Sequence, residues 1–193
     1  MVTNGIINLF CLDFNGEGAP YIQIDDKQKN IFQKYFDNLD VVKKYAQRHK
    51  VYWLCIKKGE IKIDGVSALG HCEAYPRSKT LNNYHNEVRQ YKVTLRGDID
   101  LHLKQKEIQK INAGFGIDVN EKDFYYWLFF HELGHTYEAN KDYHAGATVP
   151  SETEEELKAK QKFRIKQEEL AKKYCVKLYM EWKSGLNIES LPG

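Results

Sequence analysis

The chain has 193 residues, of which 42% are hydrophobic and 13% aromatic, and this composition excludes an intrinsically disordered protein. Its 29 basic and 27 acidic side chains give a formal net charge of +2, so the charge balance requires neither a nucleic acid nor an anionic membrane as partner. We expect one domain over residues 1–193 and no membrane helix, because no apolar run approaches the roughly 18–20 residues that a span needs.

Residues 1–96 are predicted to hold the sheet and one helix. The apolar start of the chain lacks a basic leader region, so it predicts an N-terminal strand or arm rather than a signal peptide. Residues 21–24 are a short strand candidate. Apolar side chains then recur at steps of three and four residues, which predicts a helix over 25–48 with Asp25 or Asp26 as its N-cap.

The middle of the chain predicts further strands. Two apolar runs flank "KKGE", so we expect a hairpin of 51–57 with 60–64 and then a strand over 66–74. Residues 77–87 are predicted as a loop. Apolar and polar side chains alternate over 88–96, which indicates a half-buried antiparallel strand and a candidate sheet edge that an extended peptide could join.

The rest of the chain is predicted to be mainly helical. The expected elements, in chain order, are a helix or extended segment over 98–111, a loop over 112–118, a helix over 121–140, a loop over 141–150 and a long helix over 152–184. Asp118 or Asn120 can cap the helix over 121–140. Ser151 with Glu154 fits a capping box for the helix over 152–184, which ends near Gly185. This order indicates the α+β class, with a small antiparallel sheet packed against a helical half.

The four cysteines, Cys11, Cys55, Cys72 and Cys175, are widely spaced and form no C-x-x-C pair. A zinc ribbon or a redox dithiol is therefore not indicated. We expect four free thiols in a reducing cytoplasm, since disulfides are rare there.

The stretch "HELGH", residues 131–135, carries the chemistry. Positions i and i+4 share one face of a helix, so His131 and His135 can both direct imidazole nitrogens at one metal ion. Glu132 lies beside that ion and can take a proton from metal-bound water, which makes it the candidate general base. The apolar "YYWLFF" before the motif is typical of a core helix. The alternative is a pair of buried histidines beside a solvated glutamate.

The third ligand is open between two residues. One class of zinc peptidase continues the motif as H-x-x-G-x-x-H, which would place a glycine at 138 and a third histidine at 141. This chain has Glu138 and Lys141 there, so that class is excluded. His144 follows in the next loop and is one alternative. Glu168 is the other, because it falls in line with the apolar stripe of helix 152–184, where a carboxylate needs a partner.

"HELGH" followed by "EELAKKYCVKLY" resembles the compact gluzincins, closest to the ImmA/IrrE-type metallopeptidases and more distantly the SprT-like group. Those proteins carry HExxH on one helix and E-x-x-A-x-x-[FY]-[AC] on the next. Glu168, Ala171, Tyr174 and Cys175 match the second pattern, and the resemblance covers about 121–180. The chain departs from it at Lys172, where the family often has an acidic or amide residue that supports the ligands.

The resemblance implies a zinc-dependent peptidase with His131, His135 and Glu168 as Zn²⁺ ligands and Glu132 as the catalytic base. It implies a protein or peptide substrate inside the cell, and some members cleave repressors of mobile elements. An oxyanion-stabilising group is expected as well. The candidates for that role are Tyr143, His144 and Tyr174.

Two other functions compete with this prediction. The chain could be a non-catalytic or regulatory metal-binding module of the same fold, although pure zinc binding does not require Glu132. The lysine-rich "KQKEIQK" and "KAKQKFRIK" weakly indicate nucleic-acid binding, but both segments are interleaved with acids or apolar residues and are typical of solvated helix faces. The sequence leaves the oligomeric state open.

Overall fold

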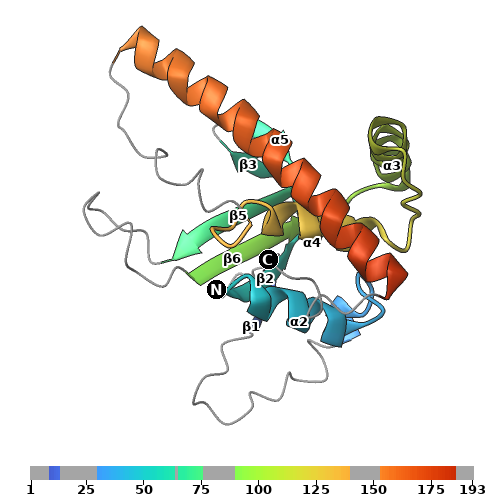
Figure 1. The fold of residues 1–193 in the computed structure, drawn as a ribbon. Coiled ribbons are helices and arrows are strands. Elements are labelled where there is room, and N and C mark those ends of the chain that lie inside the picture. Colours follow the sequence, from blue (N-terminus) through green and yellow to red (C-terminus); the bar gives the residue numbers. More distant parts are fainter. Residues whose placement is uncertain (1–8, 14–29, 64, 76–89, 140–152, 186–193) are drawn as a thin grey trace, which may run out of the picture.

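The computed structural model describes residues 9–13, 30–63, 65–75, 90–139 and 153–185 (Figure 1). The strands are β1 (Leu9–Asp13), β2 (Val51–Lys57), β3 (Ile61–Ile63), β4 (Val66–Ala68), β5 (Gly70–Tyr75) and β6 (Gln90–Arg96). The helices are α2 (Leu39–Arg48), α3 (Leu101–Phe115), α4 (Phe124–Leu133) and α5 (Glu154–Ser184). The predicted α+β class is confirmed.

The main sheet has the order β1-β2-β6-β5, and β3 pairs with β4 in a separate ribbon. It is mixed rather than antiparallel, because β2 and β6 run parallel while the β1–β2 and β5–β6 pairs are antiparallel. The predicted hairpin of 51–57 with 60–64 is wrong. β2 is apolar over most of its length, which is typical of an interior strand, and it pairs with two strands distant in sequence.

The strand predicted over 88–96 was a candidate for a sheet edge, but β6 is an interior strand, since it lies between β2 and β5. Its alternation is confirmed: Tyr91, Val93 and Leu95 are buried and the residues between them are half-buried. Among the strands that the structure describes, β5 is the edge next to β6. The strand predicted over 66–74 divides into β4 and β5.

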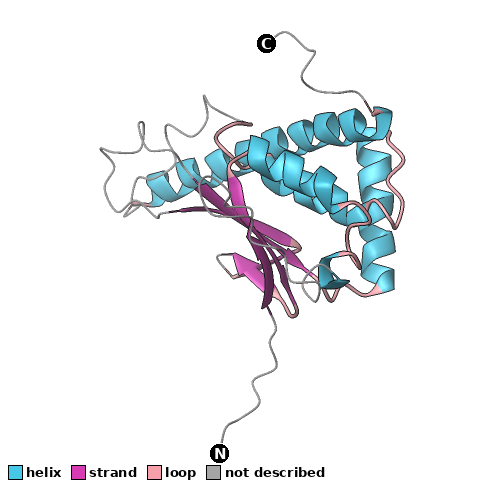
Figure 2. Ribbon diagram, turned by 90° about the horizontal axis from the view of Figure 1, so that it is seen from below, coloured by secondary structure: helices cyan, strands magenta, loops and turns pink. Residues whose placement is uncertain are grey.

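Three layers build the core. α4 packs on β5 and β6, and α5 covers the other side of α4, while α2 packs on β2. Figure 2 shows these helices gathered on one side of the sheet. Every residue of α4 except His131 is buried, which explains why "FYYWLFF" has no polar face. The middle layer therefore holds the motif rigidly.

α4 is shorter than the helix predicted over 121–140, and its N-cap is Asp123 rather than Asp118 or Asn120. The Asp123 carboxylate does not cap the helix. It accepts hydrogen bonds from Tyr179 at 2.8 Å and from Lys183 at 2.9 Å, both on α5. This buried contact fixes the start of α4 against α5.

α5 begins two residues later than predicted, because Thr153 and Glu156 form its capping box instead of Ser151 and Glu154. It ends as predicted at Gly185, which has a left-handed backbone. Among its described side chains, Ala171, Cys175, Leu178, Tyr179 and Glu181 are buried. The preceding turns extend beyond the sheet, as Figure 1 shows, and carry exposed polar residues.

Two further segments differ from expectation. The ambiguous segment over 98–111 is helix α3, which continues to Phe115 and is capped by the Asp100 side chain. The helix predicted over 25–48 is interrupted, because the Asn38 side chain accepts hydrogen bonds from the amides of Asp40 and Val41 and starts α2 there.

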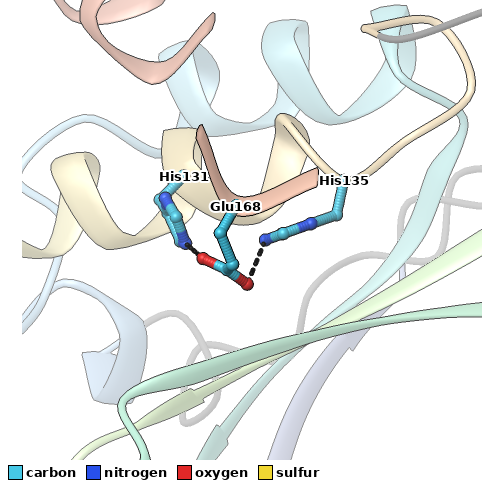
Figure 3. A group of neighbouring side chains, drawn as sticks. All are labelled: His131, His135 and Glu168. Carbon is cyan, nitrogen blue, oxygen red and sulfur yellow. Dashed lines mark ion pairs between the residues drawn. The ribbon is translucent and has the colours of Figure 1, made fainter. Parts of the chain in front are cut away.

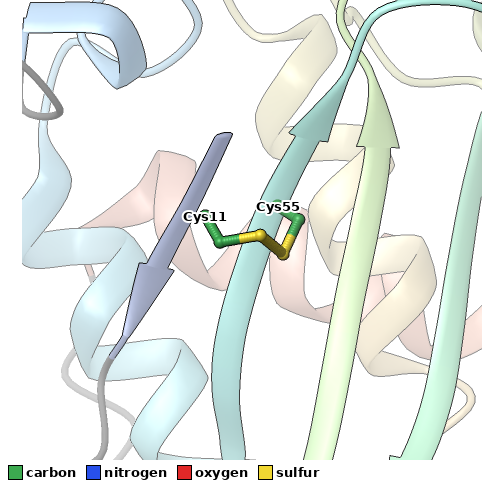
Figure 4. The surroundings of a disulfide bond; sticks show 2 residues. All are labelled: Cys11 and Cys55. Atoms are coloured by element: carbon green, nitrogen blue, oxygen red, sulfur yellow. A yellow bond between two sulfur atoms is a disulfide. The ribbon is translucent and has the colours of Figure 1, made fainter. Parts of the chain in front are cut away.

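A disulfide joins Cys11 of β1 to Cys55, directly opposite on β2 (Figure 4). The expectation of four free thiols is therefore wrong for this pair, while Cys72 and Cys175 are free. Widely spaced cysteines did not reveal the pairing, because it depends on β1 and β2 being neighbours.

No helix in the described part of the chain is both long enough and apolar enough to cross a membrane. Some of the predicted elements lie outside the described residues. They are the strand over 21–24, the loops over 77–87 and 141–150, and the start of the helix over 25–48.

Candidate metal centre

His131, His135 and Glu168 converge at one point between α4 and α5 (Figure 3). The Glu168 carboxylate lies between the two imidazoles, with its Oε2 3.4 Å from His131 Nε2 and its Oε1 3.4 Å from His135 Nε2. One ligand atom from each of the three residues lies within 4.8 Å of the other two. Of the two candidates for a third ligand, Glu168 is the one that the structure brings to the histidines. His144 lies outside the described residues.

The backbone tightens between the two histidines. α4 ends at Leu133, and the amide of His135 donates to the Glu132 carbonyl at 3.1 Å, three residues back rather than four. His135 is therefore in a turn after the helix instead of inside it. The two imidazole rings still lie close together, nearly perpendicular at an interplanar angle of 87° and with centroids 5.1 Å apart.

Gly134 sets how closely α5 approaches this turn. A Cβ atom built on Gly134 would lie 2.6 Å from the Cα and 2.7 Å from the carbonyl oxygen of Ala171. Only a glycine permits such contact with backbone atoms. Since Glu168 lies one turn before Ala171 on α5, this close approach brings its carboxylate to the histidines.

The three side chains are coupled electrostatically. Burial lowers the pKa of His131, but its hydrogen bond to Glu168 and the charges of Glu132 and Glu168 outweigh burial and raise it. The same hydrogen bond lowers the pKa of Glu168 to about 2. The hydrogen bond between Glu168 and His131 therefore favours the charged form of each group.

The donor set fits zinc. Two imidazole nitrogens and one carboxylate are the ligands of many catalytic zinc sites, which keep a fourth position for water. With metal–ligand distances of about 2.0–2.2 Å, two ligands of a tetrahedral ion lie roughly 3.3 Å apart. Both N···O distances of 3.4 Å agree with that value.

No family model, curated protein or solved structure is significantly similar to this chain. The resemblance to the ImmA/IrrE-type metallopeptidases therefore rests on the sequence motifs alone.

Glu132 lies next to the trio and is almost fully buried, with 5% of its surface exposed. Burial raises the pKa of its carboxyl to about 7, against the opposing charge of His131. Its side chain lies against β5 at Gly70, where a Cβ atom would stand 2.4 Å from Glu132 Oε1 and 2.9 Å from its Cγ. The sequence did not point to Gly70, because the contact appears only when β5 crosses the end of α4.

Gly70→Ala should displace the Glu132 carboxylate while leaving the metal ligands in place. The clash involves only a side chain and no backbone atom, so we expect the buried Glu132 side chain to shift rather than the protein to unfold. Any metal that the trio binds should be retained, and any reaction in which Glu132 is the general base should slow by roughly 10²-fold or more, the range that general bases contribute. Zinc analysis and turnover on one sample measure both, and loss of zinc together with activity would contradict this separation.

The site opens into a cavity of about 570 Å³. Apart from the trio and Glu132, its polar walls include His71 on β5 and, on α5, Arg164, Gln167 and Lys172. Lys172, the departure from the family pattern, stands one turn after Glu168, and its positive charge lowers the pKa of both Glu168 and His131.

Tyr174, an oxyanion candidate, is directed elsewhere. Its hydroxyl lies 2.9 Å from His49 Nε2, and His49 Nδ1 lies 2.9 Å from the Tyr45 carbonyl oxygen. Because Nδ1 must donate to a carbonyl, Nε2 accepts from Tyr174. The other two candidates for the oxyanion-stabilising group, Tyr143 and His144, lie outside the described residues. Tyr174 thus anchors α5 to α2.

His49 should make the protein less stable in mild acid. Burial lowers its pKa to about 4 from an ordinary 6.5, so the folded state favours the neutral ring. This stability is complete above pH 6.5 and declines as the pH falls toward 4, by roughly 3 kcal/mol at most. Urea denaturation of wild type and His49→Gln between pH 7 and 4.5 measures it, and the variant should show the shallower decline. Parallel pH profiles would contradict the prediction.

Proposed function

We propose that this protein is a zinc-dependent peptidase whose metal is held by His131, His135 and Glu168. The observation that carries the proposal is the convergence of these three side chains on one point, with the buried carboxylate of Glu132 beside them in the same cavity. The alternative is a pair of buried histidines beside a solvated Glu132. It does not account for the carboxylate of Glu168, which comes from another helix and lies 3.4 Å from both histidine side chains.

A bound zinc ion would lower the pKa of a water ligand to about 7 and polarise a substrate carbonyl. Glu132 would accept a proton from that water and later donate it to the leaving amine nitrogen. Its burial limits the positions that its carboxylate can take. Lys172 and Arg164 line the cavity, one turn after and one turn before Glu168 along α5.

The proposed substrate is a protein or peptide, and the proposed location is the cytoplasm. The Cys11–Cys55 disulfide weighs against a steadily reducing compartment, since such bonds persist mainly in oxidising ones. A count of free thiols in protein isolated under non-reducing conditions, described in the Discussion, bears on this point.

Glu168→Ala should abolish most zinc binding. We expect near one zinc per chain in wild type after stripping and reconstitution, and a large loss in the variant, because two histidines alone leave the site incomplete. Glu169→Ala is the matched control, since Glu169 is the next residue on α5, is exposed and contacts Lys166. Unchanged zinc in Glu168→Ala would exclude this ligand and make His144 the residue to substitute next.

Glu132→Gln separates an enzyme from a metal-binding module. In a peptidase the variant should keep its zinc and lose hydrolysis of a proteome-derived peptide library, read by mass spectrometry. Wild-type protein that binds zinc but cleaves no member of the library would favour the non-catalytic module.

A further inference from the structure

The cavity beside the metal ligands has two chemically different ends. One end holds the trio and Glu132. The other is apolar, with walls from α3 and α4 formed by Ile111, Phe115, Phe124, Trp127 and Leu128. Further apolar lining of the cavity comes from the strands and their connections: Ile63, Ala68, Leu69, Cys72 and Ala74. A volume of about 570 Å³ is in the range of ligand-binding pockets, so the apolar end can accept more than solvent.

α4 joins the two ends. Trp127 and Leu128 lie four residues before His131 and Glu132, so each apolar side chain shares a helix face with a polar one. At a rise of 1.5 Å per residue, the apolar wall begins about 6 Å along the helix from the metal ligands. Neighbouring Cα atoms of a peptide are about 3.8 Å apart, so the side chain beside a reacting carbonyl reaches this distance.

Phe115 is the unusual member of the wall. It is the last residue of α3, a helix without a buried residue, and 38% of its surface is exposed. Its ring lies 5.7 Å from that of Trp127, which is almost fully buried. An aromatic ring that is partly exposed inside a cavity gains from being covered by an apolar group.

The charges at this end do not favour a charged occupant. Glu107 on α3 lines the cavity, but its carboxylate is 2.6 Å from Lys110, one turn away. Outside the trio and Glu132, the other charged or polar side chains come from β5 and α5: His71, Arg164, Gln167 and Lys172. The α3 side is therefore apolar apart from a paired carboxylate.

We propose that this apolar end is a specificity subsite that takes a bulky apolar side chain, aromatic or leucine, next to the bond that is cleaved. The inference rests on the proposed function, because it uses the metal ligands to fix where that bond lies. Phe115, Trp127 and Leu128 are the specificity-determining residues, and an alanine or a charged side chain in the same place leaves them in contact with water.

Two matched series of probes test the subsite. The first is the N-acetyl hydroxamates of phenylalanine, leucine, alanine and aspartate, which can bind zinc. The second is the corresponding N-acetyl amides, which lack that group. Binding to the zinc-loaded protein is followed by calorimetry and by NMR. We expect phenylalanine and leucine to bind at least tenfold more tightly than alanine or aspartate in both series.

Phe115→Ala should reduce this preference at least threefold in both series. Leu101→Ala is the matched control, because Leu101 is also an exposed apolar residue of α3, at 58%, but does not line the cavity. Equal affinities for all four side chains, or an unchanged preference in Phe115→Ala, would overturn the subsite.

Failure of the proposed function gives a different result. Hydroxamates that bind no more tightly than amides would show that the metal centre is not formed. The ranking of side chains among the amides would still decide the subsite on its own.

Discussion

Replacing Gly134 with alanine should destabilise the protein and empty the metal site in one step. The new methyl group would stand 2.6 Å from the Ala171 Cα, and neither backbone can yield without moving a helix. Overpacking of this kind costs about 1–3 kcal/mol. Because Glu168 lies one turn from Ala171, a shift of α5 also withdraws its carboxylate from the two histidines, and we expect zinc binding to fall by at least tenfold.

Urea denaturation and zinc titration on the same variant measure the two effects. Gly114→Ala is the matched control: Gly114 is in α3, its backbone is not left-handed, and nothing lies within 4 Å of an added Cβ atom. That substitution should be neutral or stabilise by about 0.4–1 kcal/mol. Gly134→Ala with wild-type stability and zinc affinity would show that the helices are not held as closely as described.

Reduction of the Cys11–Cys55 disulfide should lower the free energy of unfolding by about 4 kcal/mol, the chain-entropy value for a loop of this length. The two cysteines are 44 residues apart, so the bond restricts a long stretch of the unfolded chain. Denaturation with and without reducing agent measures the change, and the Cys11→Ala/Cys55→Ala double variant should be insensitive to the reductant.

The number of reactive thiols gives an independent result. Unfolded protein that has not been reduced should show two, from Cys72 and Cys175. Four reactive thiols would mean that the bond is absent in the isolated protein and would return the chain to the free-thiol expectation.

The side chains that converge at the candidate metal centre could be predicted because each depends on local spacing. His131 and His135 follow from a motif, and Glu168 from its place on an amphipathic stripe. Gly70 could not be found, since its role depends on β5 crossing α4. Tyr174 matched a family pattern, yet its hydroxyl is bound to His49, 125 residues earlier. Local patterns do not contain such contacts.

In the strands, too, local features could be predicted and contacts between distant residues could not. The alternation in β6 correctly predicted which side chains are buried, because it depends on the strand alone. Which strands pair depends on the whole chain, and there the prediction was wrong. "KKGE" suggested that the strands on either side of it pair, yet β2 pairs with β1 and β6. The end of α5 was predicted because Gly185 acts locally.

The pairing of β2 also bears on how this chain folds. Its two neighbours, β1 and β6, both lie about 40 residues away in sequence, one on each side. Each pairing closes a long loop before its hydrogen bonds form, and chains with such distant contacts fold slowly. α4 needs the finished sheet beneath it, and α5 needs α4. The ability to bind a metal should therefore be among the last properties that a refolding chain recovers, so the arrival of bound zinc would mark the completion of folding.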